Sequence, residues 1–252
     1  MSNISPHAIV ERSAKVAADA VIGPFSYIGP HVRIGPECVI GNNVTIVGRT
    51  TLGEKTRVFP MAVIGTSADG DASAECVLGK ANTIREQVTI FGGTKQPTRI
   101  GQANLIMINC VVGAGAMLGD HGIIVNGTII GAEAKIEDYL HTSAFAAIAP
   151  GVSVGAYTFV AGYADVDHDA PPFAFLQGNP FRVRGVNTEG LKRCGFGEDD
   201  IRSLKEAFRE IFNGEGASAN EDALARQAGS ANTHVRRLVA VVQASRGKRR
   251  RR

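Results

Sequence analysis

The chain has 252 residues, of which 44% are hydrophobic and 20% charged, and its formal net charge is +3. This composition excludes a disordered chain and suits one large domain, or one domain with a small appendage. No apolar run approaches the ~20 residues of a transmembrane helix, and the first residues lack the pattern of a signal peptide, so neither is expected.

An aliphatic residue recurs every six positions from Val10 to Ile64, resumes at Leu78 after an insertion, and recurs again from Ile100 to Val166 with Thr142 in one slot. A glycine often follows it, and a small residue often stands two places before it. This period fits neither a helix nor a hairpin sheet. It fits a coil in which each hexad is a short strand and a tight turn, with the aliphatic and small residues facing inward.

Three hexads make one coil, so residues 18 positions apart should stack at roughly 4.8 Å. Ile28, Ile46 and Ile64 would form one inward ladder. The glycines are expected to serve turns that need a positive φ. The repeat therefore predicts a β class fold, a parallel β-helix of about eight coils.

Two insertions interrupt the repeat, at 66–76 and 92–98. Loops that leave a rigid scaffold often bind ligands, but a tolerated insertion explains them equally well.

Helical periodicity begins near Glu198, after the repeat has ended. One apolar stripe contains Ile201, Leu204, Phe208, Ile211 and Phe212, and a second contains Val235, Leu238, Val239 and Val242 after a cap at Asn232 or Thr233. The expected organisation is a β-helix domain over 1–180, a helical domain over 181–245 and a disordered basic tail over 246–252.

Charge is unevenly distributed along the chain. Residues 1–181 contain 11 Lys/Arg and 15 Asp/Glu, whereas residues 182–252 contain 16 and 9. A basic C-terminal region indicates an acidic partner or merely a solvated helical face. Arg249–Arg252 favour nucleic acid, but without an aromatic platform or a recognition helix only non-specific contact is expected.

Cys38, Cys76 and Cys110 occupy the slot otherwise taken by small residues, so they are expected to be core fillers. Unpaired cysteines suit a reducing cytoplasmic location. By the 18-residue rule His121 should stack near Tyr139, and no two histidines converge, so no metal site is predicted.

Two further histidines are candidates for polar chemistry. His141 should lie between Ile123 and Phe159 and point outward. His168 stands between Asp167 and Asp169, but neighbours in an extended chain point apart, so no dyad is expected.

Several stretches resemble the UDP-N-acetylglucosamine O-acyltransferase family of lipid A biosynthesis, in collinear order from about residue 6 to 213. They are Ile22–Phe25, Ile28–Val32, Ile84–Glu86, Val88–Ile90, Asn104–Asn109, Gln177–Asn179 and Gly185–Arg193, and the last is the most specific. The resemblance implies a left-handed β-helix with a C-terminal helical region, and a homotrimer with sites between subunits. It also implies an acyl-acyl-carrier-protein donor, a UDP-sugar acceptor and no cofactor.

The chain departs from this family where the chemistry is expected. The family's general base is a histidine, and the matching position is Ala114, which cannot accept a proton. Other polar family positions are lost too, since Val111, Phe91, Glu133, Ala149 and Pro150 stand where the family has polar residues, and the sugar-binding loop is shorter and ends near Glu75.

The substrate-binding positions that match the family are Asn187, Glu189, Arg193 and Gly162, although Cys194 replaces a second arginine. Gly162 corresponds to the glycine that bounds the family's acyl pocket. A structural alternative is that Asn187 to Glu189 cap the turn into the helical region.

These departures leave the catalytic residue unassigned, with His121, His141 and His168 as polar candidates. One interpretation is an acyltransferase with a relocated base and another acceptor, using acyl carrier protein or coenzyme A. A second is a pseudoenzyme that binds carrier protein or nucleotide sugar, and a third is lipid A acylation by positioning alone. Arg202, Lys205 and Arg209 are predicted to dock the acidic carrier protein.

Overall fold

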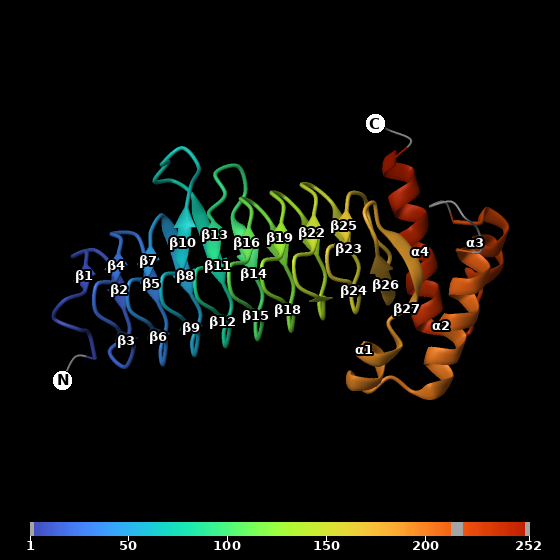
Figure 1. The fold of residues 1–252 in the computed structure, drawn as a ribbon, viewed down its shortest axis with the longest axis horizontal. Coiled ribbons are helices and arrows are strands. Elements are labelled where there is room, and N and C mark those ends of the chain that lie inside the picture. Colours follow the sequence, from blue (N-terminus) through green and yellow to red (C-terminus); the bar gives the residue numbers. More distant parts are fainter. Residues whose placement is uncertain (1–2, 213–218, 250–252) are drawn as a thin grey trace.

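The computed structural model describes residues 3–212 and 219–249, which form a left-handed parallel β-helix followed by a hairpin and four helices (Figure 1). The β-helix has three sheets, here called A, B and C, and the chain visits them in the order B, C, A on every coil. The corners between consecutive sheets are the BC edge, the CA edge and the AB edge.

The strands of each sheet are stacked in chain order. Sheet A contains β3 (Val21–Ile22), β6 (Val39–Ile40), β9 (Arg57–Val58), β12 (Thr83–Ile84), β15 (Leu105–Ile106), β18 (Ile123–Ile124), β21 (His141–Thr142), β24 (Phe159–Val160), β26 (Ala174–Gln177) and β27 (Arg182–Val186). Sheet B contains β1 (Ile9–Val10), β4 (Tyr27–Ile28), β7 (Thr45–Ile46), β10 (Val63–Thr66), β13 (Thr89–Phe91), β16 (Val111–Val112), β19 (Ile129–Ile130), β22 (Ala147–Ile148) and β25 (Asp165–Val166). Sheet C contains β2 (Lys15–Val16), β5 (Arg33–Ile34), β8 (Arg49–Leu52), β11 (Glu75–Leu78), β14 (Thr98–Ile100), β17 (Met117–Leu118), β20 (Lys135–Ile136) and β23 (Ser153–Val154).

The predicted inward ladder is confirmed. Ile28 pairs with Ile46, which pairs with Ile64, and all three side chains are buried. The register continues across both insertions, because Ile64 pairs with Ile90 and Ile90 with Val112. The core is therefore one continuous apolar column along the whole β-helix.

The expected role of the glycines is wrong. Of the glycines that follow an inward aliphatic residue, only Gly65 has a φ in the left-handed region. Positive φ occurs two places later, at residues such as Phe25 and His121. What excludes a side chain is the neighbouring coil: a Cβ on Gly23 would lie 2.7 Å from the Gly41 carbonyl carbon. Close stacking of the coils, rather than backbone conformation, selects these glycines.

The cysteines of the repeat are core residues, as predicted. Cys38, Cys76 and Cys110 are buried and free. Burial raises the pKa of the Cys76 thiol to about 12 and that of Cys110 to about 11, so both thiols stay protonated and unreactive near neutral pH.

The β-structure continues beyond the boundary expected at residue 180. After β26 the chain reverses and β27 returns antiparallel beside it, a hairpin for which the hexad pattern has no signal. Four helices follow: α1 (Thr188–Arg193), α2 (Glu198–Ile211), α3 (Glu221–Gln227) and α4 (Thr233–Arg249).

The two predicted apolar stripes form α2 and α4. The backbone of α4 runs to Arg249, so residues 246–249 are helical rather than part of a disordered tail, which accords with the high helix propensity of arginine and lysine. The rest of that predicted tail, 250–252, lies outside the described residues. Among the helices described, none has the length and apolar character needed to cross a bilayer.

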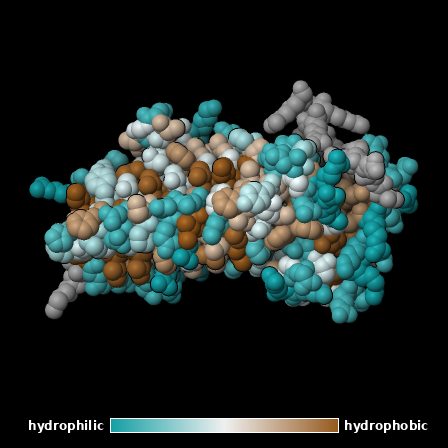
Figure 2. All heavy atoms as spheres, in the orientation of Figure 1, coloured by the Kyte–Doolittle hydropathy of each residue, from teal (hydrophilic) through white to brown (hydrophobic). Residues whose placement is uncertain are grey.

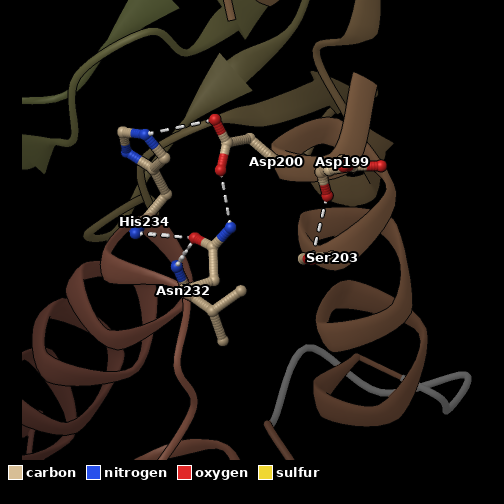
Figure 3. A network of polar contacts seen from close by, with 6 residues as sticks. Asp199, Asp200, Ser203, Asn232 and His234 are labelled. Atoms are coloured by element: carbon tan, nitrogen blue, oxygen red, sulfur yellow. Dashed lines mark hydrogen bonds and ion pairs between the residues drawn. The ribbon is translucent and has the colours of Figure 1, made fainter. Parts of the chain in front are cut away.

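A polar network joins the start of α4 to the start of α2 (Figure 3). The Asn232 Oδ1 accepts hydrogen bonds from the backbone N–H groups of His234 and Val235, so Asn232 is the cap. Its Nδ2 donates to Asp200 of α2 at 2.7 Å. One asparagine therefore both begins α4 and fixes it to α2.

Stacked aromatic rings connect these helices to the β-helix along the CA edge. His121, Tyr139 and Tyr157 stack at centroid distances of 4.9 and 4.7 Å, which confirms the expected neighbour of His121. Tyr157 then contacts Phe173 and Phe196. The helical region is thus packed against the last coils.

Candidate functional site

The BC edge carries both insertions and the position of the family's missing base. Residues 67–74 and 92–97 leave the β-helix there and project from it (Figure 1). They are tied together because the backbones of Glu75 and Gly93 exchange two hydrogen bonds of 2.9 and 3.0 Å. Ala114 follows β16 on this same edge.

Hydrogen bonds hold the backbone beside Ala114 firmly. The Thr98 Oγ1 donates to the Phe91 carbonyl and accepts from the Gly115 N–H, at 2.6 and 2.8 Å. The Gln96 amide donates to the Gly115 carbonyl at 2.8 Å. The backbone next to Ala114 is therefore held in place by side-chain hydrogen bonds. The methyl group of Ala114 itself cannot accept a proton. Sequence reasoning did not identify Gln96 and Thr98, because their partners are backbone groups.

The other altered positions lie on or beside this edge. Val111 is in the outer face of β16 and Phe91 ends β13. Glu133 lies one coil beyond Gly115, and its N–H donates to the Ala114 carbonyl at 2.9 Å. Ala149 and Pro150 occupy the same edge after β22. The structure thus gathers the replaced residues on one edge.

The positions that match the family's substrate-binding residues lie elsewhere, on and around α1. Asn187 caps this helix: its Oδ1 accepts from the Gly190 N–H at 3.1 Å, and its Nδ2 donates to the Tyr157 carbonyl at 2.9 Å. The capping role that the sequence left as an alternative is therefore present. It holds α1 at the CA edge.

Two charged residues of α1 face solvent. Glu189 forms an exposed ion pair with Lys192, at 3.7 Å. Arg193 is exposed and lies near His141 on the outer face of sheet A. Burial, and then the positive charge of Arg193, hold the pKa of the His141 imidazole below its ordinary value. His141 packs against Phe159, with ring centroids 5.2 Å apart, and pairs with Ile123, as expected.

Gly162 lies on a third part of the surface, the AB edge after β24. A Cβ there would lie 3.2 Å from the Ala144 carbonyl oxygen and 3.5 Å from the Ser143 hydroxyl. Any side chain at this position would have to displace the Ala144 carbonyl slightly, so glycine fits best.

A single chain does not assemble these parts into one pocket. Ala114 and its neighbours are on the BC edge, whereas α1 is at the CA edge and beside sheet A. Residues on different corners of a triangular coil face different directions. A site that combines them requires a second copy of the chain.

The expectation that Asp167 and His168 point apart is wrong. The chain bends at His168 directly after β25, so the two side chains converge. The His168 Nδ1 lies 2.5 Å from the Asp167 Oδ1, and the ring stacks on Phe181 at a centroid distance of 4.3 Å. The rule used for extended neighbours fails because the strand has already ended.

The predicted docking residues lie on α2 beside two hollows. Lys205 and Arg209 line both hollows, which measure about 670 Å³ and 270 Å³. Arg184 and Phe208 line the larger one, and Arg202 lines the smaller one. Arg202 is also ion-paired with Asp199 on the same helix. The described part of the chain contains no group of three His, Cys, Asp or Glu side chains placed to hold a metal ion.

Two family models and a curated protein that resemble this chain all describe transferases. The family model described as UDP N-acetylglucosamine O-acyltransferase, domain 2, matches residues 169–250, and the bacterial transferase hexapeptide model matches residues 13–48. An acyl-[acyl-carrier-protein]–UDP-N-acetylglucosamine O-acyltransferase from Anaeromyxobacter sp. (strain Fw109-5) is 38% identical over 174 residues, covering 66% of this chain and 68% of that protein.

Solved structures extend the likeness to nearly the whole chain. The UDP-N-acetylglucosamine acyltransferase from Bacteroides fragilis is 30% identical with a TM-score of 0.88, covering 96% of this chain and 97% of that one. The enzyme from Arabidopsis is 26% identical with a TM-score of 0.84, covering 96% of each chain.

Proposed function

Because the chain belongs to the UDP-N-acetylglucosamine O-acyltransferase family, we propose that it transfers an acyl group from a thioester to an acceptor other than, or in addition to, UDP-N-acetylglucosamine. The thioester would be carried by acyl carrier protein or coenzyme A. The observation behind this proposal is Ala114, which cannot accept a proton although hydrogen bonds hold the backbone beside it in place. A chain that keeps the family's fold but lacks its general base is expected to use a different base or a different acceptor.

A binding protein without turnover is the second candidate. The same alanine favours it, because general-base catalysis contributes roughly 10²–10⁴-fold. Such a protein would hold carrier protein or nucleotide sugar on the surfaces around α1 and α2.

The surface supports assembly of several copies. Ten large hydrophobic side chains are markedly exposed among the residues that the structure describes. Met117 belongs to sheet C, and the other nine belong to sheets A and B or to the AB edge between them. They are Ile9, Val21, Phe25, Val39, Met61, Ile123, Ile129, Phe145 and Tyr163. Figure 2 shows hydrophobic side chains along the β-helix, whereas the helical end is mostly hydrophilic in this view.

Exposed apolar side chains that gather on two adjoining sheets and the edge between them are typical of an interface. We therefore propose a homotrimer in which the AB edges and their flanking sheets meet. This arrangement would supply the second copy that Ala114 and α1 need in order to face one site.

The carrier protein is proposed to dock on α2. Arg184, Lys205 and Arg209 line a hollow together with Phe208 and Phe212. Acidic carrier proteins complement this charge, and complementary charge accelerates encounter.

The acyltransferase and the binding protein can be distinguished by whether free thiol is released from the thioester. The experiment offers the purified chain dodecanoyl-carrier protein and dodecanoyl-coenzyme A with a panel of hydroxyl and amino acceptors, and follows free thiol. Acceptor-dependent thiol release is expected of the acyltransferase. Binding of the thioester without any acceptor-dependent release would contradict the proposal and identify the binding protein.

A further inference from the structure

The Asp167–His168 pair has the form of a catalytic base with its orienting acid. The Asp167 carboxylate engages Nδ1 of the imidazole, which leaves Nε2 as the nitrogen able to take a proton. Phe181 covers one face of the ring. About a fifth of the histidine side chain remains exposed, 22%, so the ring is held yet reachable.

The pair lies on the same edge as the lost base. Val112, Ile130, Ile148 and Val166 are stacked inward residues of successive coils. The residue two places after each of them is Ala114, Ala132, Pro150 and His168, respectively. His168 therefore occupies the equivalent corner position three coils beyond Ala114, about 14 Å away at the usual strand spacing. In this column only Ala132 and Pro150 stand between them.

We propose that His168 is the general base of this protein's acyl transfer, with Asp167 as its positioning residue. The role rests on the function proposed above. The acceptor's O–H or N–H would lose its proton to the His168 Nε2 as its oxygen or nitrogen attacks the thioester carbonyl carbon. A C–O or C–N bond forms, the C–S bond breaks, and the proton passes to the leaving thiolate.

The other histidines have weaker claims on this role. His121 lies on the CA edge in the aromatic stack, and His141 lies on sheet A beside a cationic arginine. Among the six histidines, all within the described residues, only His168 and His234 have a carboxylate within 4.0 Å. His234 lies at the α2–α4 contact (Figure 3) and beside Phe173 of the CA edge, away from the BC edge, and its partner Asp200 also receives the Asn232 amide.

A base three coils away also explains why the acceptor would change. The acceptor's reacting group must lie near the base within hydrogen-bond reach. An acceptor whose reacting group lies beside Ala114 would not meet His168. The relocated base therefore favours acceptors that reach further toward the C-terminal coils of the BC edge.

The test compares full-length wild type with five full-length variants in the thiol-release assay: His168→Phe, His168→Ala, Asp167→Asn, Asp167→Glu and His7→Phe. Phenylalanine preserves the ring that stacks on Phe181 but cannot accept a proton. We expect His168→Phe to lower kcat by roughly 10²–10⁴-fold with KM little changed. His7→Phe is the matched control, because it also replaces a histidine whose ring stacks on a phenylalanine, Phe25, at the N-terminal end of the β-helix, and its rate should be that of wild type.

Asp167→Asn should lower kcat more than it raises KM, and Asp167→Glu should recover part of the loss. Imidazole added to His168→Ala should restore turnover, which a purely structural role would not allow. An active wild type with an equally active His168→Phe would overturn the role of His168 alone. A wild type that releases no thiol with any acceptor would overturn the proposed transfer and this role together.

Discussion

Asn82 and Asn104 are hydrogen-bonded to each other in the core of the CA edge. The Asn82 Oδ1 accepts from the backbone N–H and from the Nδ2 of Asn104, at 2.9 and 3.1 Å, and both residues are almost completely buried. The Asn104 Oδ1 in turn accepts from the Gly122 N–H at 2.6 Å. These side chains therefore connect three consecutive coils where the turns leave backbone groups in need of partners.

Replacing Asn104 with alanine should destabilise the protein by about 1–3 kcal/mol, because the buried Gly122 N–H loses its acceptor. Urea unfolding followed by circular dichroism measures this change. Asn42→Ala is the matched control: Asn42 is an exposed asparagine of the repeat, and its replacement should change stability by less than about 0.5 kcal/mol. Equal effects of the two substitutions would contradict the role given to the buried network.

His141 should make stability sensitive to acid. Its folded-state pKa is lowered, so below about pH 6.5 the unfolded chain binds a proton that the folded chain does not. Stability is therefore lost as pH falls through that value, and the loss ends below the lowered pKa. His141→Phe, which continues the aromatic column of Phe159, should flatten the thermal stability measured between pH 7.5 and 5.5. An unchanged slope would refute this origin.

The fold could be predicted from the sequence because a single six-residue repeat determines most of it. Each inward residue, such as Ile46, packs on its equivalents 18 positions away, so a local pattern determines the long-range contacts. The β26–β27 hairpin breaks that period and left no comparable signal. The sequence shows where the glycines recur but not why, since the close approach of Gly23 to the next coil is visible only in the structure.

The site was harder to predict than the fold. The replacement of the family's base by Ala114 was visible by resemblance alone. The Asp167–His168 contact was missed because it depends on a bend after β25 rather than on residue identity. The capping by Asn187 was foreseen as an alternative, since an asparagine at the start of a helix has that local chemistry.

Charge reversal on α2 should abolish docking of the carrier protein. Arg202→Glu, Lys205→Glu and Arg209→Glu together would turn a cationic surface into an anionic one, and the acidic partner would be repelled. Deletion of residues 246–252 removes a comparable positive charge from another place and should leave binding intact. Titration calorimetry at low and high salt tests both variants, since added salt should weaken wild-type binding. Loss of binding in the deletion variant with retention in the triple variant would show that the docking surface is misplaced.

The homotrimer should depend on the AB edge. Light scattering of the wild type should give about three times 26.5 kDa. Phe145→Asp with Tyr163→Asp places two charges on stacked, exposed rings of that edge, and should yield smaller species. Met117→Asp alters an exposed hydrophobic residue of sheet C and should stay trimeric. A wild type that remains a monomer at every concentration would refute the assembly.

The most direct test of the account is the steady-state rate at which the wild-type protein acylates UDP-N-acetylglucosamine from acyl carrier protein. Since Ala114 cannot accept a proton, this rate should fall far below the range of about 1–10³ s⁻¹ that is ordinary for enzymes. Ala114→His should not restore it fully, because Val111 and Phe91 also differ from the family. Wild-type turnover within that ordinary range would contradict the central claim that this chain, without the family's base, does not acylate UDP-N-acetylglucosamine at an ordinary enzymatic rate.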